Sequence, residues 1–130
     1  MRFITFSLLC LLAGTAHSVE WIRYFVNDIS VIYADPINIS RNGNIVKMWS
    51  MSDFKFAQGP SDGDHHWSER ILYEFDCSQK MSRRVYVRRY SGQMERGDVL
   101  FTSKAPTEWM PVISQTIHEK QWRLACGNRR

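Results

Sequence analysis

Four arginines flank a short apolar run near the middle of the chain. The candidate binding patch around this run has six basic and aromatic residues: Arg83, Arg84, Tyr86, Arg88, Arg89 and Tyr90. In a regular strand Arg84, Tyr86, Arg88 and Tyr90 point to one face, because side chains alternate along a strand. Guanidinium groups bind oxyanions through paired hydrogen bonds. The pattern therefore predicts a surface for sulfated glycans, acidic protein segments or haem propionates.

A structural role for the same arginines is the alternative. Glu74 and Asp76 lie in the preceding predicted strand, and opposite charges on neighbouring strands stabilise a sheet by pairing. Two carboxylates cannot neutralise four arginines. Both interpretations can therefore hold in part, with some arginines paired and others available to a ligand.

The nearest approach to a metal site is the group Asp62, Asp64, His65 and His66. Adjacent histidines in extended backbone diverge, the segment is rich in glycine, and no further ligand follows at a spacing typical of metal sites. We expect an ordinary solvated loop, with metal or haem ligation through His65 or His66 as the weaker alternative.

An acid and a base for catalysis would have to come from His65, His66, His118 and Glu119. The sequence has no nucleophile elbow, no phosphate-binding loop and no histidine–carboxylate metal spacing. His118 falls on the apolar arc of a predicted helix, which favours a hydrogen-bonded, partly buried side chain. We therefore expect a binding protein, with a small secreted hydrolase as a weaker alternative.

Strands must position most of these residues. Alternating patterns separated by turn signals predict strands over 21–26, 31–33, 37–40, 45–54, 67–77, 83–90 and 99–102. Asn42-Gly43 between two of these strands is a hairpin signal, because both residues tolerate positive φ. Residues 55–66 have a loop composition, and residues 105–111 form a connector.

The strand over 67–77 has the clearest alternation. Its apolar face has five residues: Trp67, Ile71, Tyr73, Phe75 and Cys77. The opposite face has Ser68, Arg70, Glu74 and Asp76, joined by Leu72. Four tryptophans of the chain stand in apolar patterns and are expected in the core: Trp21, Trp49, Trp67 and Trp122. Trp109 lies in the connector, where it can cap the sheet edge or contact a partner.

A helix is predicted at the C-terminal end. Thr116 and Glu119 have the spacing of a capping box, in which each side chain satisfies a free backbone donor at the other residue. At about 100° per residue, the polar arc contains Glu119, Lys120 and Arg123, and the apolar arc contains Ile117, Trp122, Leu124, Ala125 and Cys126.

The N-terminus has the features of an export signal. Arg2 precedes an apolar run that ends in small residues, which predicts a signal peptide over 1–18 and a mature domain over 19–130. Cys10 lies within the apolar run, so we expect it to fill that run rather than to accept a lipid. The net charge of +4 is too modest to imply nucleic acid. Cys77 and Cys126 are the two cysteines left after cleavage, and export predicts a disulfide between them.

The order of several short motifs resembles the surface-adhesin protein E family of Gram-negative bacteria. The first part comprises Tyr33-Ala34-Asp35-Pro36, Ile39, Arg41 to Val46, Trp49 and Asp53. The second comprises Tyr73 to Cys77, Arg83, Tyr90-Ser91-Gly92, Met94 and Gly97. The last comprises Trp109-Met110-Pro111, Thr116, Trp122 and Cys126. The resemblance covers essentially the whole predicted mature chain.

The resemblance implies an α+β fold, with a single antiparallel sheet of about six strands and one C-terminal helix tethered to it by the disulfide. It also implies binding of host matrix or serum proteins such as laminin, vitronectin and plasminogen, and a link to haem. The predicted location is periplasmic, secreted or at the cell surface, without a lipid anchor. A periplasmic accessory protein without a host ligand is the alternative, and a homodimer remains open.

Overall fold

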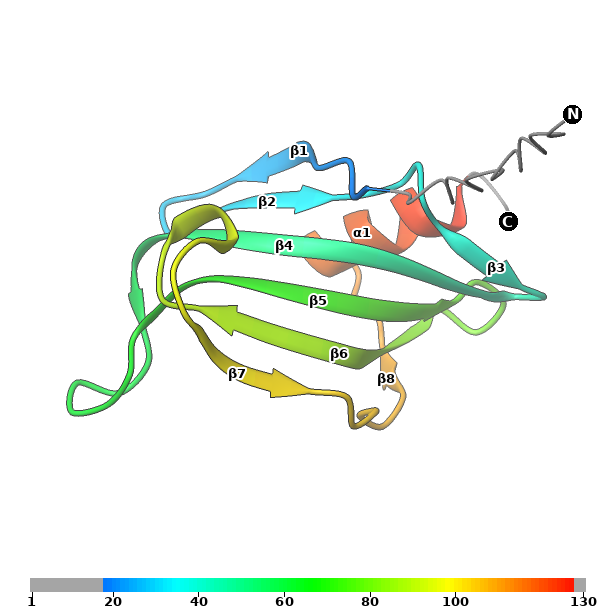
Figure 1. The fold of residues 1–130 in the computed structure, drawn as a ribbon. Coiled ribbons are helices and arrows are strands. Elements are labelled where there is room, and N and C mark those ends of the chain that lie inside the picture. Colours follow the sequence, from blue (N-terminus) through cyan, green and yellow to red (C-terminus); the bar gives the residue numbers. More distant parts are fainter. Residues whose placement is uncertain (1–17, 128–130) are drawn as a thin grey trace, which may run out of the picture.

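A computed structural model describes residues 18–127, which form one antiparallel sheet of eight strands and one helix (Figure 1). The strands are β1 (Ile22–Val26), β2 (Ser30–Ala34), β3 (Ser40–Asn42), β4 (Ile45–Gln58), β5 (His66–Asp76), β6 (Met81–Tyr90), β7 (Val99–Ser103) and β8 (Met110–Pro111). A short 3₁₀ turn, η1 (Gln93–Glu95), precedes β7, and the helix α1 spans Ile117–Cys126. The sheet order is β1-β2-β4-β5-β6-β7, with β3 beside β4 and β8 beside β6. These features confirm the predicted fold class.

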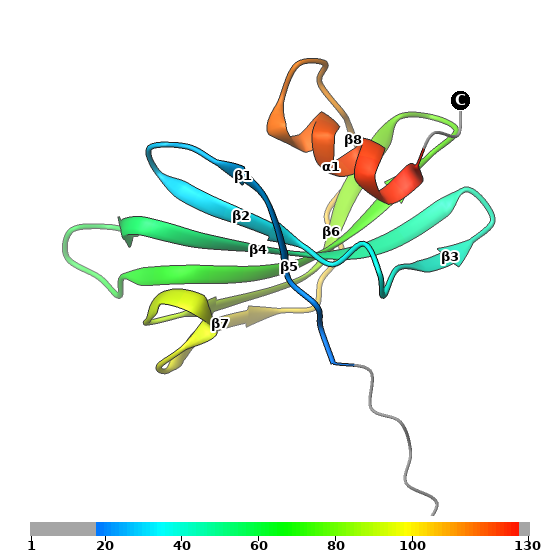
Figure 2. The ribbon, with the colours of Figure 1, turned by 90° about the horizontal axis from the view of Figure 1, so that it is seen from above.

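Helix α1 lies against one face of the sheet, which we call the covered face (Figures 1 and 2). The core between them is a cluster of six buried residues: Ala34, Val46, Met48, Phe75, Ala125 and Cys126. Val46 pairs with Phe75 across β4 and β5, which places both side chains on this face. The opposite face has no α-helix over it among residues 18–127, and we call it the open face.

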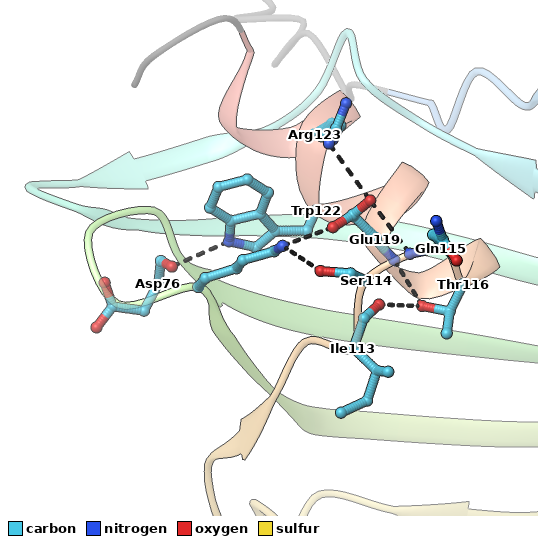
Figure 3. A network of polar contacts seen from close by, with 9 residues as sticks. Asp76, Ile113, Ser114, Gln115, Thr116, Glu119, Trp122 and Arg123 are labelled. Carbon is cyan, nitrogen blue, oxygen red and sulfur yellow. Dashed lines mark hydrogen bonds and ion pairs between the residues drawn. The ribbon is translucent and has the colours of Figure 1, made fainter.

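The Cys77–Cys126 disulfide joins the end of β5 to the last residue of α1, as predicted, with a Cα–Cα distance of 5.6 Å. A second link lies beside it, because the Trp122 indole donates a 3.0 Å hydrogen bond to the Asp76 carbonyl (Figure 3). No helix within residues 18–127 is long and apolar enough to cross a membrane.

The helix begins at the predicted N-cap, but the predicted capping box is only half formed. Thr116 is the N-cap, and its hydroxyl accepts a 3.2 Å hydrogen bond from the Glu119 amide. The Glu119 carboxylate accepts from the Gln115 amide instead of completing the box at Thr116, and it also contacts Lys80 at 2.5 Å (Figure 3). This ion pair with Lys80, in the turn between β5 and β6, explains why Glu119 is buried although it lies on the predicted polar arc.

The buried side of α1 differs from the predicted apolar arc. Gln121 is buried, whereas Leu124 is 37% exposed. Gln121 faces the sheet because its amide donates a 3.0 Å hydrogen bond to the Ser50 hydroxyl of β4. Hydrogen bonding to the sheet, which a count of apolar residues cannot detect, therefore sets the rotation of the helix.

Several predicted boundaries are wrong for local reasons. Residues 35–39 bend instead of forming a strand, because the buried Asp35 carboxylate accepts hydrogen bonds from the backbone and side-chain amides of Asn38. The predicted loop over 55–66 shortens to 59–65, since Gln58 pairs with His66. The hairpin between β3 and β4 turns at Gly43 and Asn44, with positive φ at Gly43.

The tryptophans also differ from the prediction, because none of the five is fully buried. Trp122 packs against the core cluster. Trp21 and Trp49 flank the Arg70 guanidinium instead, with ring centroids at 5.3 Å and 5.2 Å. Trp109 lies under the Arg83 guanidinium at 4.7 Å. Three of the five rings therefore pack against arginine.

The predicted signal peptide lies almost entirely outside the described residues, and so does Cys10. The boundary between residues 18 and 19 stays a prediction.

Removing the disulfide should destabilise the domain. The bond closes a loop with a sequence separation of 49 residues. Loss of that closure should lower the free energy of unfolding by about 4 kcal/mol on the chain-entropy model. Urea unfolding of the oxidised protein and of a Cys77→Ala/Cys126→Ala variant measures this difference. Equal unfolding midpoints and slopes would show that α1 needs no covalent tether.

Candidate functional site

The open face presents polar and aromatic side chains in three rows across the central strands. Cross-strand neighbours in β4, β5 and β6 define the rows, because paired residues share a face. The rows are Lys47–Glu74–Arg83, Trp49–Leu72–Tyr86 and Met51–Arg70–Arg88. The central row is apolar and aromatic, and each outer row contains cations.

A groove of about 570 Å³ lies over these rows. Its floor includes Trp49, Leu72 and Tyr86, and Lys104 and Pro106 extend its wall beyond β7. Trp49 and Tyr86 meet edge to face, with ring centroids 5.3 Å apart. The groove therefore combines an aromatic floor with basic side chains, which suits an anionic ligand that has an apolar part.

Three cations of the groove have no ion pair within the described part of the chain: Lys47, Arg88 and Lys104. Lys47 and Lys104 are exposed. The Arg88 Nε atom is buried without a hydrogen-bond partner, and its guanidinium lies 5.8 Å from the Tyr86 ring centroid. Because Arg88 lines the groove and has no ion pair there, its guanidinium favours an anionic ligand.

Other arginines of the candidate patch pair with carboxylates. Arg83 contacts Glu74 at 3.2 Å, and Arg89 contacts Glu69 at 3.2 Å. The predicted pairing therefore holds for Glu74 but is wrong for Asp76. The Asp76 carboxylate accepts from Ser78 and Gln79 in the turn after β5, and the Ser78 hydroxyl lowers its pKa despite the opposing effect of desolvation.

The predicted shared face of Arg84, Tyr86, Arg88 and Tyr90 is wrong at Arg84. Leu72 pairs with Tyr86 and Tyr73 pairs with Arg84, so Val85 is an extra residue in β6. This β-bulge moves Arg84 to the covered face and leaves Tyr86, Arg88 and Tyr90 on the open face, joined by Arg83. Arg89, opposite Glu69, is on the covered face. Strict alternation could not reveal the bulge.

Arg70 and Glu95 are a pair that the sequence analysis missed. The Arg70 Nε and Nη2 atoms donate to the two Glu95 carboxylate oxygens, with an Nη2–Oε2 distance of 3.0 Å. Burial acts to lower the Arg70 pKa, but the Glu95 hydrogen bond and charge outweigh it, so the pKa is raised. Strand alternation placed Arg70 on the polar face, but no local signal connected it to a residue so far along the chain.

The histidines of the 59–66 region do not assemble a metal site. His65 Nε2 lies 2.7 Å from the Pro60 carbonyl, and the His66 ring meets Phe54 edge to face at 5.6 Å. Within residues 18–127, no group of three or more histidine, cysteine, aspartate or glutamate side chains is arranged to hold a metal ion. Haem ligation by His65 or His66 stays a prediction.

His118 belongs to a hydrogen-bonded chain between α1 and the sheet, as the sequence analysis expected of a partly buried histidine. Its Nε2 lies 2.5 Å from the Ser82 hydroxyl, and its Nδ1 lies 2.8 Å from Gln121 Oε1. Because the Gln121 amide nitrogen donates to Ser50, its oxygen accepts, and Nδ1 of the neutral imidazole carries the proton. Ser82 then donates to Nε2.

A cleft of about 550 Å³ lies beside this chain, with Tyr73 and Arg84 among its lining residues. Burial raises the pKa of Tyr73 to about 12. Burial also lowers the pKa of His118 below its ordinary value, and the Arg84 charge acts in the same direction. Glu119 contacts Lys80 and Arg123 rather than His118. The candidate acid and base are therefore engaged with separate partners.

The His118 environment predicts a loss of stability in mild acid. A folded-state pKa below about 6.5 means that the unfolded chain binds the proton more readily. The contribution of neutral His118 to the free energy of unfolding is fully present above a pH of about 6.5. This contribution is lost as the pH falls through the lower, folded-state pKa. Urea unfolding between pH 7.5 and 5.5 should give a decreasing free energy, and His118→Gln should flatten this dependence. His66→Gln should remove a separate part of the pH dependence, since burial lowers the pKa of His66 too. An undiminished slope in His118→Gln would contradict the assignment.

Comparisons with known proteins agree with this architecture. A family model described as surface-adhesin protein E matches residues 21–127. Crystal form II of Haemophilus influenzae protein E has 16% identity and a TM-score of 0.65, with 88% of this chain and 92% of that chain covered. Protein E from non-typeable Haemophilus influenzae has 17% identity and a TM-score of 0.62, with 88% and 80% covered.

At these identities the solved structures establish the fold alone, and no curated protein matches the chain significantly in sequence. The family model covers most of the chain and places the protein among exported or surface adhesin-like proteins. The chain belongs to the surface-adhesin protein E family.

Proposed function

We propose that this protein is a non-enzymatic adhesion module that binds an acidic macromolecule, such as a host matrix or serum protein, through the groove on its open face. The observation that carries this proposal is the set of three groove cations that have no carboxylate partner in the described part of the chain, Lys47, Arg88 and Lys104. Family membership supports the adhesin-like role.

The charges of the groove favour an anionic partner. Among residues 18–127, Glu74 is the only carboxylate that lines it, and Arg83 already pairs with this group. A ligand carboxylate would gain charge-assisted hydrogen bonds from the Arg88 guanidinium, which has no ion pair within residues 18–127. The exposed lysines would add attraction that salt screens. Binding should therefore weaken as ionic strength rises.

The bulge at Val85 provides a matched pair of variants for testing this face. Arg88→Gln should weaken binding about tenfold, the effect of losing one charge-assisted hydrogen bond. Arg84→Gln removes the same charge from the covered face and should leave binding unchanged. Surface plasmon resonance on immobilised vitronectin and laminin, at two salt concentrations, measures both.

Equal losses in the two variants would reject the open face as the binding surface. No binding by the unaltered protein would instead favour a periplasmic accessory role without a host ligand.

We expect no enzymatic turnover, because the Glu119 carboxylate pairs with Lys80 and Arg123 while the imidazole nitrogens of His118 bond to Ser82 and Gln121. Assays on RNA, peptide and ester substrates test this expectation. Turnover that His118→Ala abolishes, in a variant that remains folded by circular dichroism, would contradict the proposal.

A further inference from the structure

A carboxylate of the protein itself pairs with one of the arginines that line the open-face groove. Arg70, which lines the groove, donates two hydrogen bonds to Glu95. The Trp21 indole donates to the same carboxylate at 3.4 Å. The Arg70 guanidinium also lies over the Trp21 and Trp49 rings, at 5.3 Å and 5.2 Å from their centroids. The two indoles thus hold the guanidinium where its donors face a carboxylate.

The segment that supplies Glu95 has an unfavourable backbone conformation. Met94 and Glu95 have φ values of 53° and 60°, a left-handed region that residues with a Cβ atom seldom adopt. Burial does not offset this cost, because η1 has no buried residue. Favourable contacts with the sheet must therefore hold these two residues in place.

Polar contacts hold this segment on the sheet. The Met94 amide donates to the Asp53 carboxylate at 2.8 Å, and the Glu95 amide donates to the Ser68 hydroxyl at 2.9 Å. The third contact is the pairing of the Glu95 carboxylate with Arg70. A competing carboxylate at Arg70 would remove one of these contacts and favour release of the strained conformation.

We propose that the groove recognises the carboxylate side chains of an acidic protein segment, and that Glu95 occupies the position that one ligand carboxylate takes at Arg70. This inference rests on the proposed function. The ligand segment displaces Glu95 from Arg70 and pairs its other carboxylates with Arg88, Lys47 and Lys104. Glu95 therefore lowers affinity and selects ligands with enough negative charge to displace it.

The group that pairs with Arg70 in this structure is itself a carboxylate, which favours a carboxylate ligand at this position. Arg70 presents two donors to the two oxygens of Glu95. A sulfate can accept from a guanidinium in the same paired manner. Carboxylate and sulfate ligands are therefore separate arms of the test.

Glu95→Gln separates the charge of this residue from its shape. The amide fills the same space and can still accept from Arg70, but it competes less strongly with an anionic ligand. Isothermal titration with a Glu-rich peptide should show several-fold tighter binding to Glu95→Gln than to the unaltered protein. The same peptide with Gln in place of Glu should not bind either protein.

A second variant loosens the segment without changing Glu95. Asp53→Ala removes the acceptor of the Met94 amide and should also tighten binding of the Glu-rich peptide. Nuclear magnetic resonance provides an independent readout, because the Trp21 indole N–H signal should shift when the peptide displaces Glu95. A heparin-derived oligosaccharide of equal charge should bind more weakly than the Glu-rich peptide.

The outcomes distinguish this inference from the proposed function. The peptide could bind in an Arg88-dependent manner but no more tightly to Glu95→Gln and Asp53→Ala than to the unaltered protein. That result would overturn the displacement of Glu95 and leave the proposed function standing. Tighter binding of the oligosaccharide than of the peptide would overturn the choice of carboxylate. If no acidic ligand binds in an Arg88-dependent manner, the proposed function fails as well.

Discussion

The attachment of the single helix to one face of the sheet is the constraint on which the rest of the structure depends. The Cys77–Cys126 disulfide fixes the end of α1, and the Gln121–Ser50 and Lys80–Glu119 contacts fix its rotation. The buried core lies under the helix, with Met48 and Phe75 fully enclosed. The described residues provide no second helix, so the other face must be compatible with solvent.

The chain meets this requirement with arginines packed against aromatic rings. Arg70 lies over Trp21 and Trp49, and Arg88 lies over Tyr86. Such cation–π packing covers part of the rings, and the guanidinium groups can still donate hydrogen bonds to carboxylates, as Arg70 does to Glu95. The same arrangement that makes an uncovered sheet face stable therefore also makes it a surface for anions. The bulge at Val85 decides which arginines belong to it.

Local signals in the sequence predicted much of this fold. The alternation over 67–77, the Thr116 cap and the two cysteines identified the longest clear strand, the helix start and the tether. Features set by distant partners were missed. Gln121 is buried because Ser50 accepts its hydrogen bond, and Arg70 belongs to the site because η1 brings Glu95 to it. The position of Arg84 depended on one unpaired residue, which alternation alone cannot locate.

Lysine footprinting would test most directly whether the open face is the binding surface. Lys47 and Lys104 are exposed beside the groove, whereas Lys55 and Lys120 are exposed but do not line it. Acetylation of the protein with and without a bound acidic partner, followed by mass spectrometry, compares the four residues in one experiment. The account predicts protection of Lys47 and Lys104 and unchanged modification of Lys55 and Lys120. Protection of Lys120 on the helix, with Lys47 and Lys104 still reactive, would contradict it.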